Sequence, residues 1–314
     1  MRYLPEKYYL RRIKSYFNKM LPLGNCMLVS AFLYFSFTGF LGIIIGIERL
    51  DISITSIAGI WSLFSITVIL RLMDELKDKE IDKALFPERP LPSGLVKEKD
   101  IVFTLILVVS LYLICNLLIP DTFYFAVILI SYTFLMFRFF FMPDLLRRKL
   151  LLNLATHNPV VAVILTFLVV LFIHQHNIPS KDMNWNKVIL LILMFWSVFF
   201  SWEISRKIRS AEEENEYVTY SQIFGRKASI EILSAAQTFA LGCGIYFYYS
   251  FHLSPLFMII VCLGYVMAMY ANIRFILKPN SFTSQLKPFT HIYMLSILIA
   301  MIVQQIISLS GVLK

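Results

Sequence analysis

Three aspartates stand at regular spacing where a long apolar run of the chain stops. Asp74, Asp78 and Asp82 lie four residues apart. On a helix, each four-residue step turns a side chain by about 40° and advances it by about 6 Å, so the three carboxylates are predicted to line one helix face over roughly 12 Å. That row is too long for a single cation, but it suits one or two oxygen-ligated metal ions with phosphate oxygens between them.

The residues around this row leave a second interpretation open. Glu75 and Lys79 are spaced for an ordinary i,i+4 ion pair, which favours a solvated helix face with no further role. The metal interpretation is preferred because the carboxylates stand at the mouth of a hydrophobic segment long enough to span a membrane. A proline-rich segment with Arg89 near its centre follows, so the helix is predicted to give way to a turn that closes at Gly94.

The motif D-x-x-x-D-x-x-x-D, followed seven residues later by RPLPSG, resembles the first aspartate-rich motif of the UbiA-type intramembrane prenyltransferases. That family usually has Asn at the first position, where this chain has Asp74, and the change keeps an oxygen ligand while it adds a charge. The resemblance implies a magnesium-dependent enzyme in which Asp78 and Asp82 are the leading metal ligands and Asp74 is the next. Arg89 is a candidate for binding the oxygens of a diphosphate.

The composition is that of a polytopic membrane protein of the all-α class. Of the 314 residues, 58% are hydrophobic and only 16% are charged. Apolar runs of about 20 residues predict nine transmembrane helices. The resemblance implies the same number, arranged in a UbiA-like bundle with a lipid-accessible cavity. Gln237, Asn272 and Gln304 in the last three spans are predicted to form interhelical hydrogen bonds. The predicted spans are 25–47, 54–73, 101–119, 122–142, 154–174, 187–205, 230–250, 254–277 and 289–311.

The positive charges are distributed unequally between the segments that connect the predicted spans. With a cytoplasmic N-terminus, 25 of the 29 Lys and Arg residues fall in cytoplasmic segments, and only four fall on the opposite side. This bias predicts a multi-pass protein with its C-terminus on the side opposite to the cytoplasm and its active site facing the cytoplasm. The net charge of +9 is then explained by topology and by anionic lipids, and nucleic acid is not an expected partner.

Two regions are predicted along the chain. The basic segment 1–22 has apolar residues at helical spacing, among them Ile13 and Phe17, and is expected to form an interfacial helix on the cytoplasmic leaflet. A disordered basic tail is the alternative for this segment. Residues 23–314 are predicted to form a single nine-helix transmembrane domain.

Further candidates lie in the connection between the fourth and fifth spans and near the start of the fifth span. By the resemblance, Arg148 and Lys149 help to hold the diphosphate, although they are also placed to anchor the span ends as ordinary positive-inside residues. His157 and Asn158 come just before Pro159, where a kinked helix would expose polar groups to the acceptor or to the diphosphate. A histidine that only packs inside the protein is the alternative at that position.

The segment after the sixth span stands where the family carries its second aspartate-rich motif. Its tail, VTYSQIFG, resembles the T-x-S-x-x-x-G segment that follows that motif, but no aspartate precedes it. Glu203 and Glu212 are the nearest acids, and Arg206 and Lys207 stand among them. We expect the two cations to bind the diphosphate in place of a second metal, with Glu203 orienting Lys207. Headgroup anchoring by the cations and a solvated charge cluster are the alternatives.

Together, these residues predict the transfer of an isoprenoid from a prenyl diphosphate to a lipophilic or aromatic acceptor, with Mg2+ assisting the departure of the diphosphate. The 28 Phe and 16 Tyr residues are numerous enough to shield an allylic cation. A UbiA-type terpene cyclase that needs no acceptor and a non-catalytic lipid transporter remain alternatives. The expected partners are the two substrates and membrane lipids, and no obligate protein partner is evident.

Overall fold

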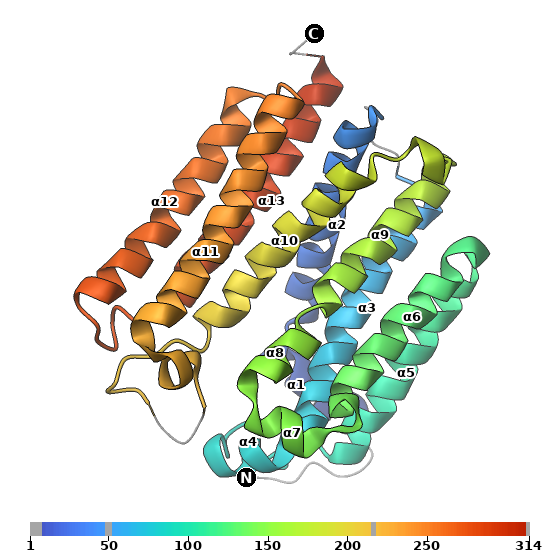
Figure 1. The fold of residues 1–314 in the computed structure, drawn as a ribbon. Coiled ribbons are helices and arrows are strands. Elements are labelled where there is room, and N and C mark those ends of the chain that lie inside the picture. The colour runs from blue at the N-terminus through green and yellow to red at the C-terminus, as the bar shows by residue number, and fades with distance from the viewer. Residues whose placement is uncertain (1–7, 48–51, 215–217, 312–314) are drawn as a thin grey trace. The chain divides into compact units, whose positions relative to one another are not determined.

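The computed structural model describes residues 8–47, 52–214 and 218–311, and within these ranges the regular secondary structure is helical (Figure 1). Eight helical segments are long and apolar enough to cross a membrane, and a shorter apolar helix covers residues 121–137. These nine segments of the described residues overlap the nine predicted spans, and the prediction of an all-α membrane protein is confirmed, with eight of the segments long enough by themselves to cross a membrane. The helices are α1 (Tyr9–Met20), α2 (Leu23–Ile45), α3 (Ile54–Lys77), α4 (Lys79–Leu85), α5 (Glu98–Leu117), α6 (Pro120–Phe137), η2 (Phe139–Phe141), α7 (Pro143–Arg148), α8 (Leu150–His157), α9 (Val160–His176), η3 (Ser180–Asp182), α10 (Trp185–Ser205), α11 (Tyr220–Ser250), α12 (Pro255–Leu277) and α13 (Lys287–Ser310).

The helices pack into two compact units, and α2 and α9 contribute to both. In the first unit, α3 packs against α5 and α6, and α1 packs on α5. In the second unit, α10, α11, α12 and α13 pack in succession, and α13 also contacts α10. The first unit comprises residues 1–34, 51–149 and 170–176, and the second comprises residues 35–50, 150–169 and 177–314.

Helix α1 is amphipathic and buries one face inside the first unit. Phe17 lies in a hydrophobic core that also contains residues of α2, α3 and α5. Arg12, on the same face, is 3% exposed, and its Nε and Nη2 atoms each lie 2.7 Å from a carboxylate oxygen of Asp100 on α5. The location of the predicted segment 1–22 on a membrane leaflet stays a prediction, and its residues 1–7 lie outside the described part of the chain.

Polar side chains link the membrane helices of the second unit. Asn272 of α12 donates from Nδ2 to Oε1 of Gln237 on α11 at 2.8 Å. Gln304 of α13 accepts from the backbone nitrogen and the hydroxyl of Ser254, both at 2.8 Å. Because lipid offers no hydrogen-bond partners, polar groups buried in such helices must be satisfied by one another. The interhelical hydrogen bonds predicted for these three residues are confirmed.

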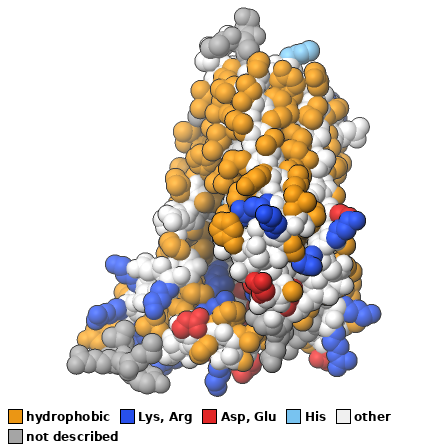
Figure 2. All heavy atoms as spheres, turned by 90° about the vertical axis from the view of Figure 1, so that its left-hand side faces the viewer, with side chains coloured by type: hydrophobic (Ala, Val, Ile, Leu, Met, Phe, Trp, Pro, Cys, Tyr) orange, Lys and Arg blue, Asp and Glu red, His pale blue; other side chains and the backbone are white. Residues whose placement is uncertain are grey.

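One face of the molecule shows how polar and apolar side chains separate along the helices. In Figure 2, hydrophobic side chains cover most of the upper part, whereas lysine, arginine and acidic side chains gather at the lower end. Large hydrophobic residues of α12 are exposed, among them Leu263, Val266 and Ile273. An apolar band that ends in charged residues is the surface expected of helices that cross a membrane.

Candidate active site

The aspartate motif crosses a break between two helices. Helix α3 ends at Lys77 and α4 begins at Lys79, so Asp78 lies at the junction with φ −99° and ψ 8°. The i to i−4 backbone bonds continue through the break, from the nitrogen of Asp78 to the oxygen of Asp74 at 2.9 Å and from the nitrogen of Asp82 to the oxygen of Asp78 at 2.8 Å. Asp74 is exposed and Asp78 is half-buried, whereas Asp82 is 5% exposed. The single open face predicted for the three carboxylates is therefore interrupted at Asp78.

Asp82 and Arg89 form an ion pair on the C-terminal side of this break. Arg89 donates from Nη1 to Oδ1 of Asp82 at 2.6 Å, and their side chains are 32% and 7% exposed. The guanidinium also lies over the ring of Phe86, with Cζ 4.0 Å from the ring centroid. A carboxylate this deeply buried requires a charged partner. Since a guanidinium has five N–H donors, Arg89 can hold Asp82 and bind a further anion at the same time.

The RPLPSG segment folds into consecutive turns that position Arg89. The backbone nitrogen of Arg89 donates to the oxygen of Phe86 at 3.0 Å, and the nitrogen of Ser93 donates to the oxygen of Arg89 at 2.9 Å. Gly94 adopts φ +74°, a left-handed conformation that glycine reaches without a steric penalty. Its nitrogen donates to the oxygen of Leu91 at 3.1 Å. The predicted turn after the aspartate motif is confirmed.

Glu75 and Lys79 pair with other partners rather than with each other, so the predicted i,i+4 pair was wrong. Glu75 is 1% exposed and accepts from Nη2 of Arg71 at 2.7 Å. Lys79 lies 3.0 Å from the carboxylate of Glu98 on α5, and this hydrogen bond and the charge of Glu98 raise the pKa of Lys79. Glu75 lies on the buried side of α3, whereas Lys79 lies beyond the break at Asp78, as the first residue of α4.

The carboxylate oxygens of this segment suit a magnesium ion that is bound partly by the protein and partly by a substrate. The described residues contain no group of three His, Cys, Asp or Glu side chains that could by itself hold a metal ion. Magnesium is ordinarily bound by one or two carboxylates together with waters and substrate phosphate oxygens. Asp74 and Asp78 are four residues apart and supply two carboxylates, while Asp82 pairs with Arg89. The residues present therefore fit a metal ion whose coordination is completed by a diphosphate.

The remaining basic candidates of the first unit lie at the end of α7. Arg148 is the last residue of this helix, and Lys149 follows it. Both side chains are exposed. Their exposure is compatible with either role considered for them, binding of diphosphate oxygens or anchoring at lipid headgroups.

His157 and Asn158 lie at the break between α8 and α9, in the second unit. His157 is the last residue of α8, and its Nδ1 is 3.0 Å from the backbone oxygen of Asn153. Asn158 lies just before Pro159, and its Oδ1 is buried without a hydrogen-bond partner among the described residues. The predicted kink is present, and it leaves one polar atom with an unused capacity to accept a hydrogen bond.

Glu203 holds two cations at the end of α10. Its Oε2 accepts from Nη1 of Arg206 at 3.0 Å, and its Oε1 lies 3.1 Å from Nζ of Lys207. The i,i+4 contact predicted between Glu203 and Lys207 is therefore present. The Arg206 guanidinium also lies over the Trp202 ring, 4.7 Å from the centroid, and Lys207 lies 5.8 Å from the ring centroid of Tyr220. These contacts set the positions of both cations.

The loop between α10 and α11 uses its own polar residues to fold. Glu214 accepts from the hydroxyls of Thr219 at 2.8 Å and Ser221 at 2.6 Å. These are the threonine and the serine of the T-x-S-x-x-x-G segment, and its Gly225 breaks the start of α11 with φ +76°. Glu212 is exposed. The segment that resembles the end of the second motif thus organises this loop through hydroxyl–carboxylate contacts.

A histidine that sequence reasoning missed lies beside the Trp202 ring. Trp202 donates from Nε1 to Nε2 of His291 on α13, and the two rings stack with their centroids 5.8 Å apart. Because Nε2 accepts this bond, the neutral His291 carries its proton on Nδ1. The two residues are 89 positions apart, so no local spacing signals the contact.

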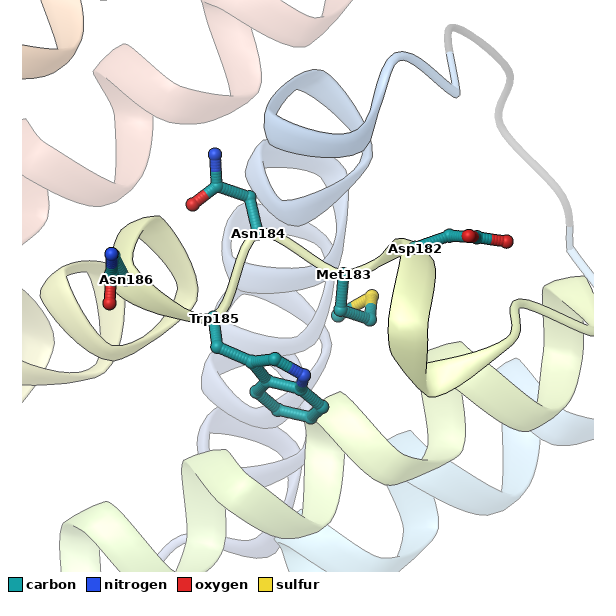
Figure 3. Close-up of a pocket in the computed structure, with 5 residues that line it drawn as sticks. All are labelled: Asp182, Met183, Asn184, Trp185 and Asn186. Atoms are coloured by element: carbon teal, nitrogen blue, oxygen red, sulfur yellow. The ribbon is translucent and has the colours of Figure 1, made fainter.

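A pocket of about 440 Å³ lies at the opposite end of α10 from Arg206. Figure 3 shows that its polar side chains, Asp182, Asn184 and Asn186, point in different directions instead of converging. Asn184 accepts from the backbone nitrogen of Lys187 at 3.4 Å and so caps α10. The residues of this pocket do not form a candidate catalytic site.

Comparisons with known proteins identify the family and the fold of the chain. The sequence profile of the UbiA prenyltransferase family matches residues 33–297, and the chain belongs to that family. It is an integral, multi-pass membrane protein with the UbiA fold. No curated protein sequence matches the chain.

Two solved structures are similar to the whole chain. A digeranylgeranylglyceryl phosphate synthase has 20% sequence identity and a TM-score of 0.64, over 94% of this chain and 99% of that chain. The apo structure of a UbiA homolog from Aeropyrum pernix K1 has 12% identity and a TM-score of 0.67, over 90% and 98% of the two chains. At these identities the similarity concerns the fold alone.

Proposed function

We propose that the protein transfers an isoprenoid from a prenyl diphosphate to a lipophilic or aromatic acceptor. The observation that carries this proposal is the segment at the end of α3, where Asp74 and Asp78 precede the Asp82–Arg89 pair. Carboxylates that bind magnesium, beside a guanidinium that binds phosphate oxygens, are the groups that a diphosphate leaving group requires. Membership of the UbiA family and the similarity to a digeranylgeranylglyceryl phosphate synthase support a prenyl group as the transferred unit.

The residues of this segment divide the work of releasing the diphosphate. The sequence favours Asp78 and Asp82 as the leading Mg2+ ligands; because Asp82 pairs with Arg89, we propose Asp78 and Asp74 as the ligands instead. When bound, Mg2+ would act as a Lewis acid that stabilises the negative charge of the diphosphate. Asp82 keeps the guanidinium of Arg89 oriented, and Arg89 donates hydrogen bonds to the oxygens on which negative charge develops. The bond between the first prenyl carbon and the diphosphate oxygen breaks, and its electron pair leaves with the diphosphate. The acceptor then forms a bond to the first prenyl carbon of the allylic cation and loses its proton to water.

Four further residues are assigned on less direct grounds. Arg148 and Lys149 are exposed in the same unit as Arg89, and we assign them to the diphosphate oxygens. We assign Asn158, with the adjacent His157, to the acceptor. A buried oxygen without a partner costs about 1–3 kcal/mol, which a hydroxyl or N–H group of a bound acceptor would recover at Oδ1 of Asn158.

Diphosphate release from a panel of prenyl diphosphates tests the proposal. The protein in lipid nanodiscs is assayed with and without Mg2+ and with and without candidate acceptors. Release that depends on both Mg2+ and an acceptor supports a transferase. Release with a cyclic hydrocarbon and no acceptor would instead identify a terpene cyclase, and binding without release would indicate a lipid-binding or transport protein.

We predict that Arg206→Gln weakens prenyl diphosphate binding or turnover ten- to a hundredfold. This is the loss of one charge-assisted phosphate contact, roughly 1.5–3 kcal/mol. The magnesium dependence should remain that of a single site, because side chains supply the positive charge that a second metal would bring. The measurements are the donor KM and turnover across a magnesium titration.

Lys227→Gln is the matched control for Arg206→Gln. It also removes one positive charge near the α10–α11 loop, but this lysine is exposed and makes only a long contact of 3.9 Å with Glu231 among the described residues. Lys227→Gln should change the donor KM and the turnover by less than about twofold from the wild-type values. Wild-type kinetics in an Arg206→Gln/Lys207→Gln double variant, or a cooperative requirement for two magnesium ions, would contradict the proposal that these two cations bind the diphosphate in place of a second metal.

We predict that the α9–α10 loop and the α12–α13 loop lie on opposite sides of the membrane, with the latter cytoplasmic. The reason is the distribution of Lys and Arg along the chain. In the second unit the two loops lie at opposite ends of the helices (Figure 1). Cysteines introduced at the exposed Ser180 and Ser281 of a cysteine-free variant should react with an impermeant thiol reagent from opposite faces of sealed vesicles. Labelling of both from one face would show that the topology is wrong.

A further inference from the structure

The side of α3 that faces away from solvent carries a fourth carboxylate beside the aspartates. Glu75 is 1% exposed and follows the exposed Asp74 directly. Its Oε2 accepts from Nη2 of Arg71 at 2.7 Å and from the hydroxyl of Tyr16 on α1 at 3.3 Å. Tyr16 is fully buried. A buried carboxylate is stable only with partners of this kind, so Arg71, Glu75 and Tyr16 form one coupled group, called here the Glu75 network.

Contacts that do not involve α3 fix the helix that supplies Tyr16. Arg12 pairs with Asp100 of α5 through two bonds of 2.7 Å, and both side chains are nearly inaccessible. The hydroxyl of Tyr9 is 2.7 Å from the hydroxyl of Thr104, which also lies on α5. Helix α1 is thus held by these contacts with α5 as well as by the hydrophobic core that it shares with α3, so loss of the Tyr16 hydroxyl should leave the helix in place.

The opposite flank of the same helical turn is also held. Nζ of Lys77 lies 3.4 Å from the backbone oxygen of Met136 on α6, and 3.9 Å from the centroid of the Phe139 ring. The last turn of α3 is therefore restrained by α1 through Glu75 and by α6 and η2 through Lys77. Asp74 lies on this restrained turn, and Asp78 follows at its end.

We propose that Tyr16 and Glu75 are positioning residues that fix the rotation of the last turn of α3, and thereby the placement of the Asp74 and Asp78 carboxylates for a metal–diphosphate complex. This inference rests on the proposed function. A helix with its side chains has a radius of about 5–6 Å, so a rotation of about 20° moves a carboxylate by about 2 Å. That displacement equals the whole magnesium–oxygen bond length, and magnesium requires near-ideal octahedral geometry.

A pair of matched substitutions on α1 tests the proposal. Tyr16→Phe removes the hydroxyl bond to Glu75 of α3, and Tyr9→Phe removes a hydroxyl contact with Thr104 of α5. Binding of Mn2+ to the purified protein with inorganic diphosphate is followed by electron paramagnetic resonance, which needs no turnover. Tyr16→Phe should weaken Mn2+ binding five- to twentyfold and raise the Mg2+ concentration for half-maximal diphosphate release by a similar factor. Turnover at saturating Mg2+ should fall less, and Tyr9→Phe should change each quantity less than twofold.

Glu75→Gln provides a second route to the same conclusion. It should shift Mn2+ binding in the same direction as Tyr16→Phe, and thermal unfolding shows what fraction of each variant is folded. Wild-type Mn2+ affinity in both Tyr16→Phe and Glu75→Gln would overturn the positioning role, as would an equal loss in Tyr9→Phe. A wild-type protein that releases no diphosphate with Mg2+ would overturn the proposed function instead, so the two failures are distinguishable.

Discussion

Replacement of Asp78 by Asn is expected to lower the rate of diphosphate release by about 100-fold or more, while the protein still folds. Asn has nearly the same shape but lacks the charge, and removal of one charged ligand from a hard cation should raise the barrier by about 3 kcal/mol or more. The helical hydrogen bonds through Asp78 use backbone atoms, which the substitution leaves in place. Release rates over a magnesium titration, with thermal unfolding in parallel, measure the two effects separately.

Asp74→Asn is the matched comparison on the preceding turn. It restores the residue that the UbiA family usually has at this position, and the amide oxygen remains available as a metal ligand. Turnover is expected to stay within about fivefold of the wild-type rate at saturating magnesium. An inactive Asp74→Asn together with an active Asp78→Asn would show that the ligand assignment is reversed.

Arg89→Gln is expected to reduce both stability and turnover. It leaves the carboxylate of Asp82, whose side chain is 7% exposed, without its charged partner. Breaking a largely buried pair on one side should lower the free energy of unfolding by about 1–3 kcal/mol. The variant also lacks the guanidinium that is proposed to bind the diphosphate oxygens. Turnover should therefore fall by about 100-fold, as for other charged groups that stabilise a leaving group. Unfolding by denaturant or heat and the rate of diphosphate release are the measurements.

A double variant separates the two effects of Arg89. In Arg89→Gln/Asp82→Asn no uncompensated charge remains buried, so the free energy of unfolding should recover most of its loss. Turnover should stay low, because the guanidinium is still absent. Lys79→Gln, which removes an exposed pair with Glu98, should change neither quantity appreciably. Recovery of turnover in the double variant would show that Arg89 only supports Asp82 and does not bind the diphosphate.

The sequence by itself determined the class of the protein and the place of its candidate site. Apolar runs of about 20 residues can be identified locally, because the length of a membrane helix is set by the thickness of the bilayer. The nine segments found in the structure therefore match the nine predicted spans. The RPLPSG turn was equally predictable, since proline and glycine restrict or release the backbone whatever surrounds them.

Only the tertiary structure decided which side of each helix faces its neighbours. Helical spacing gave the angles between Asp74, Glu75 and Asp78 but not the direction in which they point. Packing of α1 turned Glu75 toward Tyr16, 59 residues away, and the break at Asp78 led Asp82 to pair with Arg89. Helical spacing offers Glu75 two cations on its own flank, Arg71 and Lys79, and only the packing of α3 decided that the buried carboxylate pairs with Arg71 and also reaches Tyr16 on α1. For this reason the motif was predictable from sequence, and the contacts that hold it in place were not.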